Sequence, residues 1–563
     1  MAAGERVGFR DAARWLIEVV GPDQAYLRLA VVYGVAISLL SLATPISVQL
    51  LINSVANTAR PTALWTLSGV LFLLLLLVAV LSALRVYTMA LFERRVFARV
   101  VAEVTVRAVH AQNPFFGDAK RQSLFNRFFD LTVVQKAIPS LFIGGFTIVL
   151  QSVVGLVITS FYHPFFLAFN AILLLVLLLV WLLWSRGSFA SAVALSHAKH
   201  DAAHWLESVG GSNGFYKSSR HLDFAMDRSE EVTAAYINRH KRYFRYSFAQ
   251  TIACLLLYAL ASAALLALGG MLILRGELSV GQLVAAELIL SGVFYGVSQL
   301  GWYLDTFYDL VASSEELSLL FAIPQERSAK VDGLAPRDGA VRLRDVRGGR
   351  ACFDFELKSG EQVVAVAEPG VGRQLALLLK RHETPSSGLL TIGGSDLAGL
   401  DMYLLRSAVV VLDRPSIVEM TIREYLSLAA ADAGSEAMLT TLAQVDLADR
   451  VAQLPQGLDT PLASSGAPLS IGEVMELKLA NAMLSRPRVL MLSQLFDLMD
   501  PAKLSRALSS LRQAGTTVIL FTGRPGAVDL DRWLLMGAAH QRSFPTLAAL
   551  EHARLGTEVD HAV

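Results

Sequence analysis

The sequence predicts an α-helical membrane domain, made of six transmembrane helices with long cytoplasmic extensions, followed by a soluble α/β domain. The hydrophobic content of 54% and the mean hydropathy of +0.49 are too high for an ordinary soluble protein, and the apolar excess precedes residue 325. After residue 340, short β-branched runs alternate with helical runs, which is typical of a parallel α/β sheet. A glycine-rich turn joins one such strand, residues 363–366, to the helix that follows it.

Length and composition narrow the function classes. A chain of 563 residues should hold more than one domain, and its net charge of +1 gives no reason to expect nucleic acid as a partner. Two cysteines, Cys254 and Cys352, predict neither a disulfide framework nor a metal site. The N-terminus mixes acids with arginines and has no cleavage site, so we expect no secretory signal. Residues 8–26 predict either an amphipathic helix on the inner membrane face or a soluble helical lead-in.

Six apolar runs reach the roughly 20 residues that a helix needs to cross the hydrocarbon core. Only the sixth run contains a charged residue, Glu287, and a carboxylate in a membrane span is a candidate for function. Because Glu287 closely follows Arg275, it could instead lie near the outer interface, and the sequence leaves its role open. The predicted spans are 29–55, 62–84, 140–162, 165–185, 248–274 and 278–304.

The links between the spans alternate in length and charge. Links 85–136 and 186–245 are long and contain nine Lys plus Arg each, whereas the short links have almost none. The positive-inside rule therefore places the long links and both termini in the cytoplasm. Breaks at residues 113–118 and 210–219 predict either helical hairpins whose tips dock on a soluble domain or simple surface turns.

The glycine turn of the soluble half lies in VVAVAEPGVGRQLALLL, residues 363–379, and is typical of a phosphate-binding P-loop, G-x-x-x-x-G-K-[ST]. Gly370 and Gly372 let backbone N–H groups approach a phosphate, and the helix N-terminus favours an anion. Arg373 replaces the motif's lysine, keeping the charge in a wide planar fork. Gln374 replaces the serine or threonine and cannot supply the hydroxyl that binds Mg²⁺.

Six spans with two long extensions, GELSVGQL at 276–283 and LPQGLDT at 454–460 resemble a half-transporter of the ABC exporter family. Residues 43–55 and 207–209 resemble its type I secretion branch, which exports polypeptides. The resemblance implies a transmembrane domain at 1–326, a linker at 327–340, an ABC nucleotide-binding domain at 341–545 and a C-terminal tail at 546–563.

The resemblance also shows which chemical positions have changed. The family places a glutamine at Asp413, an aspartate that holds the metal at Ser493, a catalytic glutamate at Gln494 and a histidine at Gly523. Serine is a poor Mg²⁺ anchor, because this cation prefers carboxylates and phosphate oxygens. Gln494 cannot accept a proton, and losing a general base typically costs about 10²–10⁴ in rate. We therefore expect no intact catalytic residue, no metal site and no ATP hydrolysis by this chain alone.

The segment LSIGE, residues 469–473, resembles the family signature LSGGQ, which begins a helix and binds the γ-phosphate held by the opposite subunit. Ser470 and Gly472 are retained, and Asp500 stays at the family's D-loop position. Glu473 replaces the glutamine and would add a negative charge near that phosphate.

The hypothesis that follows is a catalytically impaired exporter half, which pairs with an ATPase-competent ABC half in the bacterial inner membrane. ATP and Mg²⁺ would then bind at a composite site with the partner. Resemblance to type I secretion favours a polypeptide substrate and implies a periplasmic adaptor and an outer-membrane channel as further partners. Two alternatives remain: a membrane scaffold or regulator that does not transport, and a slow ATPase homodimer that uses Asp413 or Asp497.

Overall fold

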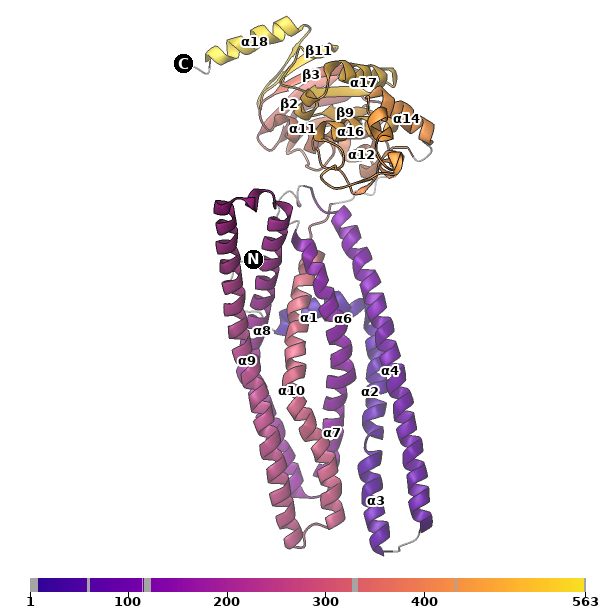
Figure 1. Ribbon diagram of the computed structural model, residues 1–563, viewed down its shortest axis with the longest axis vertical. Coiled ribbons are helices and arrows are strands. Elements are labelled where there is room, and N and C mark those ends of the chain that lie inside the picture. Colours follow the sequence, from indigo (N-terminus) through magenta and orange to yellow (C-terminus); the bar gives the residue numbers. More distant parts are fainter. Residues whose placement is uncertain are drawn as a thin grey trace. The chain divides into compact units, whose positions relative to one another are not determined.

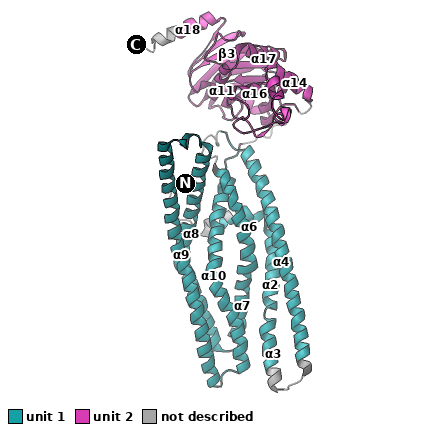
Figure 2. Cartoon of the chain, in the orientation of Figure 1, with its two compact units in different colours: residues 1–325 teal, residues 326–563 magenta. Residues whose placement is uncertain are grey.

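The computed structural model describes residues 9–57, 61–113, 115, 123–326, 333–430 and 433–560. The chain divides into two compact units, residues 1–325 and residues 326–563 (Figure 2). Unit 1 is helical and unit 2 is α/β (Figure 1), which confirms the predicted fold class.

Unit 1 is built from long helices that run roughly along one another (Figure 1). Its elements are α1 (Phe9–Val20), η1 (Gly21–Asp23), α2 (Gln24–Leu40), α3 (Ala43–Asn57), α4 (Pro61–Val109), η3 (Ser123–Asp130), α6 (Leu131–Ser140), η4 (Leu141–Gly145), α7 (Phe146–Ser160), α8 (Pro164–Gly211), η5 (Phe215–Lys217), α9 (Ser219–Leu274) and α10 (Val280–Phe321).

Six helical stretches of the described residues are long and apolar enough to cross a membrane, which confirms the predicted number. With 49 residues, α4 measures about 74 Å at 1.5 Å per residue, more than twice the roughly 30 Å of the hydrocarbon core. As predicted, the helices are therefore long enough to extend well beyond a bilayer. The six stretches are Leu16–Ile52, Leu64–Val109, Leu124–Ser160, Pro164–Gly211, Ser219–Leu274 and Val280–Phe321.

Prolines accompany two changes in helix geometry, one within the first predicted span and one just before the third, which was predicted to begin at residue 140. Pro45 lies in the first turn of α3, and because proline has no N–H to donate, the first span is divided between α2 and α3. Pro139 lies inside α6, and the π-helical turn η4 follows it within the third span. The predicted break at 210–219 is confirmed, since α8 ends at Gly211 and α9 begins at Ser219. Most of the break predicted at 113–118 lies outside the described residues.

The N-terminal helix α1 packs on unit 1 through its last residues, because Val19 and Val20 are buried in a core shared with α10. The turn after it is held by Asp23, which is fully buried and accepts bonds from Arg95 Nε at 2.9 Å and Arg99 Nε at 2.8 Å. Of the helix predicted within residues 8–26, Phe9–Val20 forms α1 and a 3-10 turn follows it, and the place of α1 on a membrane surface stays a prediction.

Unit 2 contains a six-stranded sheet in the order β12-β11-β3-β10-β9-β6, parallel except for β12, and a four-stranded antiparallel sheet in the order β2-β1-β4-β5. The strands are β1 (Val341–Gly348), β2 (Ala351–Leu357), β3 (Gln362–Ala367), β4 (Ser387–Ile392), β5 (Ser395–Asp396), β6 (Val409–Leu412), β7 (Met420–Thr421), β8 (Pro461–Leu462), β9 (Val489–Leu492), β10 (Thr517–Phe521), β11 (Arg532–Met536) and β12 (Gln541–Phe544). The helices are α11 (Val371–Leu379), η6 (Leu397–Gly399), α12 (Met402–Ala408), α13 (Ile422–Ser427), α14 (Ser435–Gln444), α15 (Ala448–Ala452), η7 (Gly457–Asp459), α16 (Ile471–Ser485), η8 (Gln494–Leu498), α17 (Pro501–Gln513) and α18 (Leu547–Asp560).

The parallel strands bring distant segments to one edge of the main sheet. Strands β3, β10, β9 and β6 are adjacent and parallel, so the loops that follow them leave from the same edge. Their side chains are almost all buried, as expected for a sheet covered on both faces. Ligands of open α/β sheets bind at this carboxyl edge, which directs attention to these loops.

Candidate functional site

A cleft of about 750 Å³ opens at the carboxyl edge of the six-stranded sheet, between the loops after β3, β6 and β9. The glycine turn and many apolar side chains line this cleft. Its lining residues are Ala367, Glu368, Pro369, Gly370, Gly372, Arg373, Ala376, Val411, Asp413, Arg414, Met491, Leu492, Ser493, Gln494, Leu495, Leu498 and Phe521.

The glycine turn keeps the backbone of a phosphate-binding loop. Gly370 is the N-cap of α11 with φ +89°, a left-handed conformation that glycine adopts without strain, and no side chain caps this helix. A Cβ atom on Gly372 would lie 3.1 Å from the ring of Phe521, so only glycine fits there comfortably. The N–H groups of Gly372 and Arg373 are therefore available to an anion, whereas the Val371 N–H already donates to the carbonyl of Glu368 at 3.2 Å. Arg373 is exposed and has no hydrogen-bond or ion-pair partner among the described residues, so its charge is also available.

The side chain of Gln374 makes contacts within the fold. Its Nε2 donates to Glu383 Oε2 at 2.8 Å, and its amide lies against the turn between β1 and β2, where a Cβ on Gly349 would be 3.0 Å from Oε1. That turn is short, since Gly348 pairs directly with Ala351. The side chain that replaces the motif's hydroxyl is thus occupied by contacts within the fold.

The end of β9 offers no carboxylate to a metal. Ser493 is the N-cap of η8, and its Oγ accepts a bond from the N–H of Leu495 at 3.4 Å. Gln494 is exposed beside it. The acid nearest the glycine turn, Glu368, is used elsewhere, because its Oε2 accepts from the N–H of Ala538 at 3.0 Å.

Asp413, after β6, is exposed and has no hydrogen-bond or ion-pair partner among the described residues. It lies within electrostatic reach of Lys380 and Lys478. Burial lowers the pKa of both lysines, and the negative charge of Asp413 opposes that shift. Lys478 also donates to the carbonyl of Arg414 at 2.7 Å. Asp413 therefore balances two partly buried lysines at the side of the cleft.

Gly523 follows β10 and its backbone is held by Asp497. The Gly523 N–H donates to Asp497 Oδ2 at 2.8 Å, and the hydroxyl of Thr522 donates to the other carboxylate oxygen. With both oxygens engaged, Asp497 ties η8 to the end of β10 and does not line the cleft. This bonding counts against Asp497 as a substitute base.

The signature helix α16 begins with a reciprocal capping box. Glu473 N–H donates to Ser470 Oγ at 3.4 Å, and Ser470 N–H donates to Glu473 Oε2 at 2.7 Å. The other Glu473 oxygen pairs with Arg450 Nε at 3.1 Å. Glu473 is therefore folded back on its own helix, while the N–H of Gly472, in the first turn, has no helical acceptor.

Sequence reasoning missed Arg450, and the motif pattern holds no signal for it because it belongs to α15. It neutralises the charge that was expected to face a phosphate at Glu473. Partial burial acts to raise the pKa of Glu473, but its bonds from Ser470 and Arg450 outweigh this, and the net effect is a lowered pKa. Asp500 caps α17, accepting from the N–H of Ala502 at 2.7 Å.

The donors in the cleft fit the two parts of a Mg-nucleotide unequally. A phosphate group matches the open N-terminus of α11 together with the unpaired Arg373. Mg²⁺ does not match, since Gln374 is bonded to Glu383 and Ser493 is a helix cap. The arrangement can hold an anion, and neither Gln374 nor Ser493 offers a magnesium ligand beside it.

Comparison with known families identifies both units. The family described as "ABC transporter transmembrane region" matches residues 27–297, and the family described as "ABC transporter" matches residues 352–493. The chain is similar over 94% of its length to 98% of a solved bacterial Atm1-family ABC exporter with ATP bound, with a TM-score of 0.79 and 19% identity. That similarity establishes the exporter fold.

Three curated relatives are 22–26% identical to the chain over the aligned residues. Leukotoxin translocation ATP-binding protein LktB of Mannheimia glucosida is 22% identical over 93% of this chain and 76% of its own length. Exotoxin translocation ATP-binding protein PaxB of Pasteurella aerogenes is 26% identical over 48% of this chain and 40% of its own. Multidrug resistance protein 3 of Entamoeba histolytica is 26% identical over 47% of this chain, which spans only 22% of that relative.

Proposed function

We propose that this ABC exporter subunit is a catalytically impaired half that works with an ATPase-competent ABC half to export a substrate. One observation carries the proposal. Ser493 and Gln494 occupy the carboxyl end of β9, and the two carboxylates among the described residues of the cleft are Glu368, bonded to Ala538, and Asp413. Neither a metal anchor nor a general base stands where the resemblance requires one.

The match to the family described as "ABC transporter" implies ATP binding with Mg²⁺. In the proposed complex, the productive site is composite: the partner supplies the P-loop, the metal ligands and the base. This chain supplies the N-terminus of α16, where the Ser470 hydroxyl can still donate and the Gly472 N–H is available. Because Arg450 holds the Glu473 carboxylate, the added acid need not repel the partner's nucleotide.

A polypeptide is the favoured substrate, because two relatives carry names that state toxin translocation. We place the chain in the bacterial inner membrane, with both termini in the cytoplasm and with a periplasmic adaptor and an outer-membrane channel as further partners. The six spans and the lysine and arginine content of the two long links support this orientation.

Purification of the full chain from native membranes tests the pairing. We expect a second ABC half with complete motifs to co-purify, and Mg²⁺-dependent ATP turnover to appear in the complex and not in this chain alone. Unrelated partners in place of an ABC half would favour a scaffold or regulator. A native complex that contains only this chain and still hydrolyses ATP would refute the proposal in favour of a slow ATPase.

The contribution of α16 has its own test in the purified complex. Aspartate caps helices about as well as serine, so Ser470→Asp keeps the helix start while placing a carboxylate where the phosphate would lie. We expect turnover to fall by at least about tenfold with little change in thermal stability, whereas Ser485→Ala, at the other end of α16, should leave it unchanged. Unaltered turnover in Ser470→Asp would contradict a composite site.

A further inference from the structure

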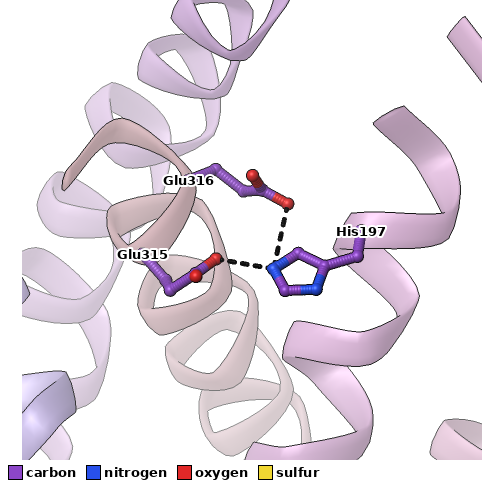
Figure 3. Close-up of side chains that lie close together, drawn as sticks. All are labelled: His197, Glu315 and Glu316. Carbon is purple, nitrogen blue, oxygen red and sulfur yellow. Dashed lines mark hydrogen bonds and ion pairs between the residues drawn. The ribbon is translucent and has the colours of Figure 1, made fainter. Parts of the chain in front are cut away.

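A compact group of side chains in unit 1 is unrelated to the nucleotide cleft. His197 of α8 lies beside Glu315 and Glu316 of α10, although 118 residues separate His197 from Glu315. Figure 3 shows the imidazole directed at both carboxylates. His197 Nε2 is 3.0 Å from Glu315 Oε2 and 3.7 Å from Glu316 Oε1. The sequence predicted no metal site, because these three residues are too far apart along the chain to form a recognisable motif.

One member of the group is buried without a satisfied hydrogen bond. Glu316 is 0% exposed, and its Oε1 accepts no hydrogen bond. Its other oxygen, Oε2, forms an ion pair with Arg127 of η3. Burying an ionised carboxylate is costly unless a partner compensates for the lost water. Oε1, which points toward His197, therefore lacks the partner that its burial requires (Figure 3).

The surrounding charges favour a cation. Arg127 supplies one positive charge for the two carboxylates of Glu315 and Glu316, and Asp130 and Asp201 also lie within its electrostatic reach. Asp130 is already bonded to Lys199 at 2.6 Å and to His200 at 2.5 Å, and no ion pair joins either of these side chains to the glutamates among the described residues. With a neutral imidazole at His197, Arg127 leaves one of the two carboxylate charges unmatched in this partly buried place.

We propose that His197, Glu315 and Glu316 together bind one divalent transition-metal ion such as Zn²⁺. One atom from each, His Nε2 and two carboxylate oxygens, lies within 4.8 Å of the others. Zinc binds such atoms at about 2.0–2.2 Å in tetrahedral geometry, which places neighbouring ligand atoms about 3.3–3.6 Å apart. The observed spacings reach this with small side-chain rotations. One imidazole and two carboxylates suit Zn²⁺ or Mn²⁺ better than Mg²⁺ or Ca²⁺, which prefer oxygen alone.

The site is accessible and its ion would join two helices. The His197 side chain is 42% exposed, so an ion can enter from that side and keep water as a further ligand. The metal would link the extension of α8 to α10 shortly before α10 ends at Phe321. Cross-linking these helices should stabilise unit 1 against unfolding, because the unfolded chain lacks the assembled site.

Zinc titration of the full chain in nanodiscs, after removal of metal with a chelator, tests the proposal. We expect one saturable site by calorimetry, and no comparable site for Mg²⁺. His197→Ala and Glu315→Gln should each weaken Zn²⁺ binding by more than about tenfold. Losing a side chain that only supports a metal ligand already costs about that much, so losing a ligand should cost more. His240→Ala, which removes an exposed histidine of α9, serves as the matched control and should bind as the unaltered chain does.

A second measurement needs no variant. Zinc-edge X-ray absorption of the loaded wild-type chain should report imidazole nitrogen together with oxygen ligands. Binding that survives both His197→Ala and Glu315→Gln, a spectrum without imidazole, or the lack of any saturable zinc site would overturn the proposal. The three side chains would then form an ion-pair network with Arg127 only.

Discussion

Two helix N-termini in unit 2 were expected to meet phosphates, and they differ in what occupies them. The N-terminus of α11 has a glycine N-cap in the left-handed conformation, no capping side chain and an unpaired cation at Arg373. The N-terminus of α16 carries the capping box of Ser470 and Glu473, which leaves the Gly472 N–H without a helical acceptor, and Arg450 holds the same glutamate. One helix start is open to an external anion, while the other already bonds an anion of its own.

The difference separates what a backbone contributes from what side chains contribute. At α11, the free N–H groups and Gly370 persist, while the side chains that would handle Mg²⁺ are used elsewhere: Gln374 bonds Glu383, and Ser493 caps η8. A phosphate-binding loop depends largely on main-chain donors, so it survives these substitutions, whereas metal binding and proton transfer depend on particular side chains.

Arg373→Ala should have the largest effect, because it removes the unpaired cation in the first turn of α11. A hydrogen bond to a charged group contributes about 1.5–3 kcal/mol, so we expect ATP affinity of the full chain to fall by about 10- to 150-fold. Binding of a fluorescent ATP analogue in EDTA measures it. Arg342→Ala, an exposed arginine paired with Glu356 on β1 and β2, is the control. Equal affinity of both variants would show that nucleotide is not held at α11.

Magnesium should matter little until its ligands are restored. In the unaltered chain we expect ATP affinity to change by less than about twofold between EDTA and Mg²⁺, since neither Gln374 nor Ser493 offers a ligand. The double variant Gln374→Ser with Ser493→Asp should gain at least about tenfold in Mg²⁺, equivalent to one charge-assisted contact. Strong Mg²⁺ dependence in the unaltered chain would mean that another acid, such as Asp413, anchors the ion.

At α16, Glu473→Ala should lower stability by about 1 kcal/mol, the usual net contribution of one hydrogen bond, because Ser470 N–H loses its acceptor while Ser470 still caps the helix. The partly exposed pair with Arg450 adds little. Thermal unfolding of the full chain in nanodiscs measures the change. Glu436→Ala, in the first turn of α14 and without a hydrogen-bond or ion-pair partner among the described residues, should change stability less. A larger loss in Glu436→Ala would argue against the capping role.

Sequence patterns predicted the architecture because it rests on local signals. Apolar runs located the six spans, and short β-branched runs predicted a parallel sheet, at whose carboxyl edge the structure places the loops with residues 370, 413, 493 and 523. The changes in helix geometry at Pro45 and Pro139 could have been predicted, since proline cannot donate within a helix. The spans were assigned from apolar composition alone, which does not report them.

Side-chain partnerships could not be predicted in the same way. Arg450 meets Glu473 across 23 residues, and His197 meets Glu315 across 118, so no motif spacing reports either contact. The motif placed a negative charge at Glu473 near a phosphate without showing which way it points, and in the structure the capping box and Arg450 draw the carboxylate back to the helix. Such contacts follow from tertiary packing, which one-dimensional patterns do not contain.

Two glutamates of α16 should show the smallest effects, with opposite dependence on pH. The bonds of Glu473 lower its pKa below the ordinary 4.5, despite partial burial, so its contribution is present above pH 4.5 and is lost as pH falls below it. Burial raises the pKa of Glu476 above 4.5, although Lys503 opposes this at 3.1 Å. The folded state therefore binds that proton more readily, and stability increases as pH falls toward 4.5.

Thermal unfolding between pH 7 and pH 3.5 separates the contributions of Glu473 and Glu476. The deficit of Glu473→Gln against the unaltered chain should shrink only below pH 4.5, whereas the difference for Glu476→Gln should change above it. The same pH dependence in both variants would mean that the two carboxylates share one environment, contrary to the contacts at the start of α16.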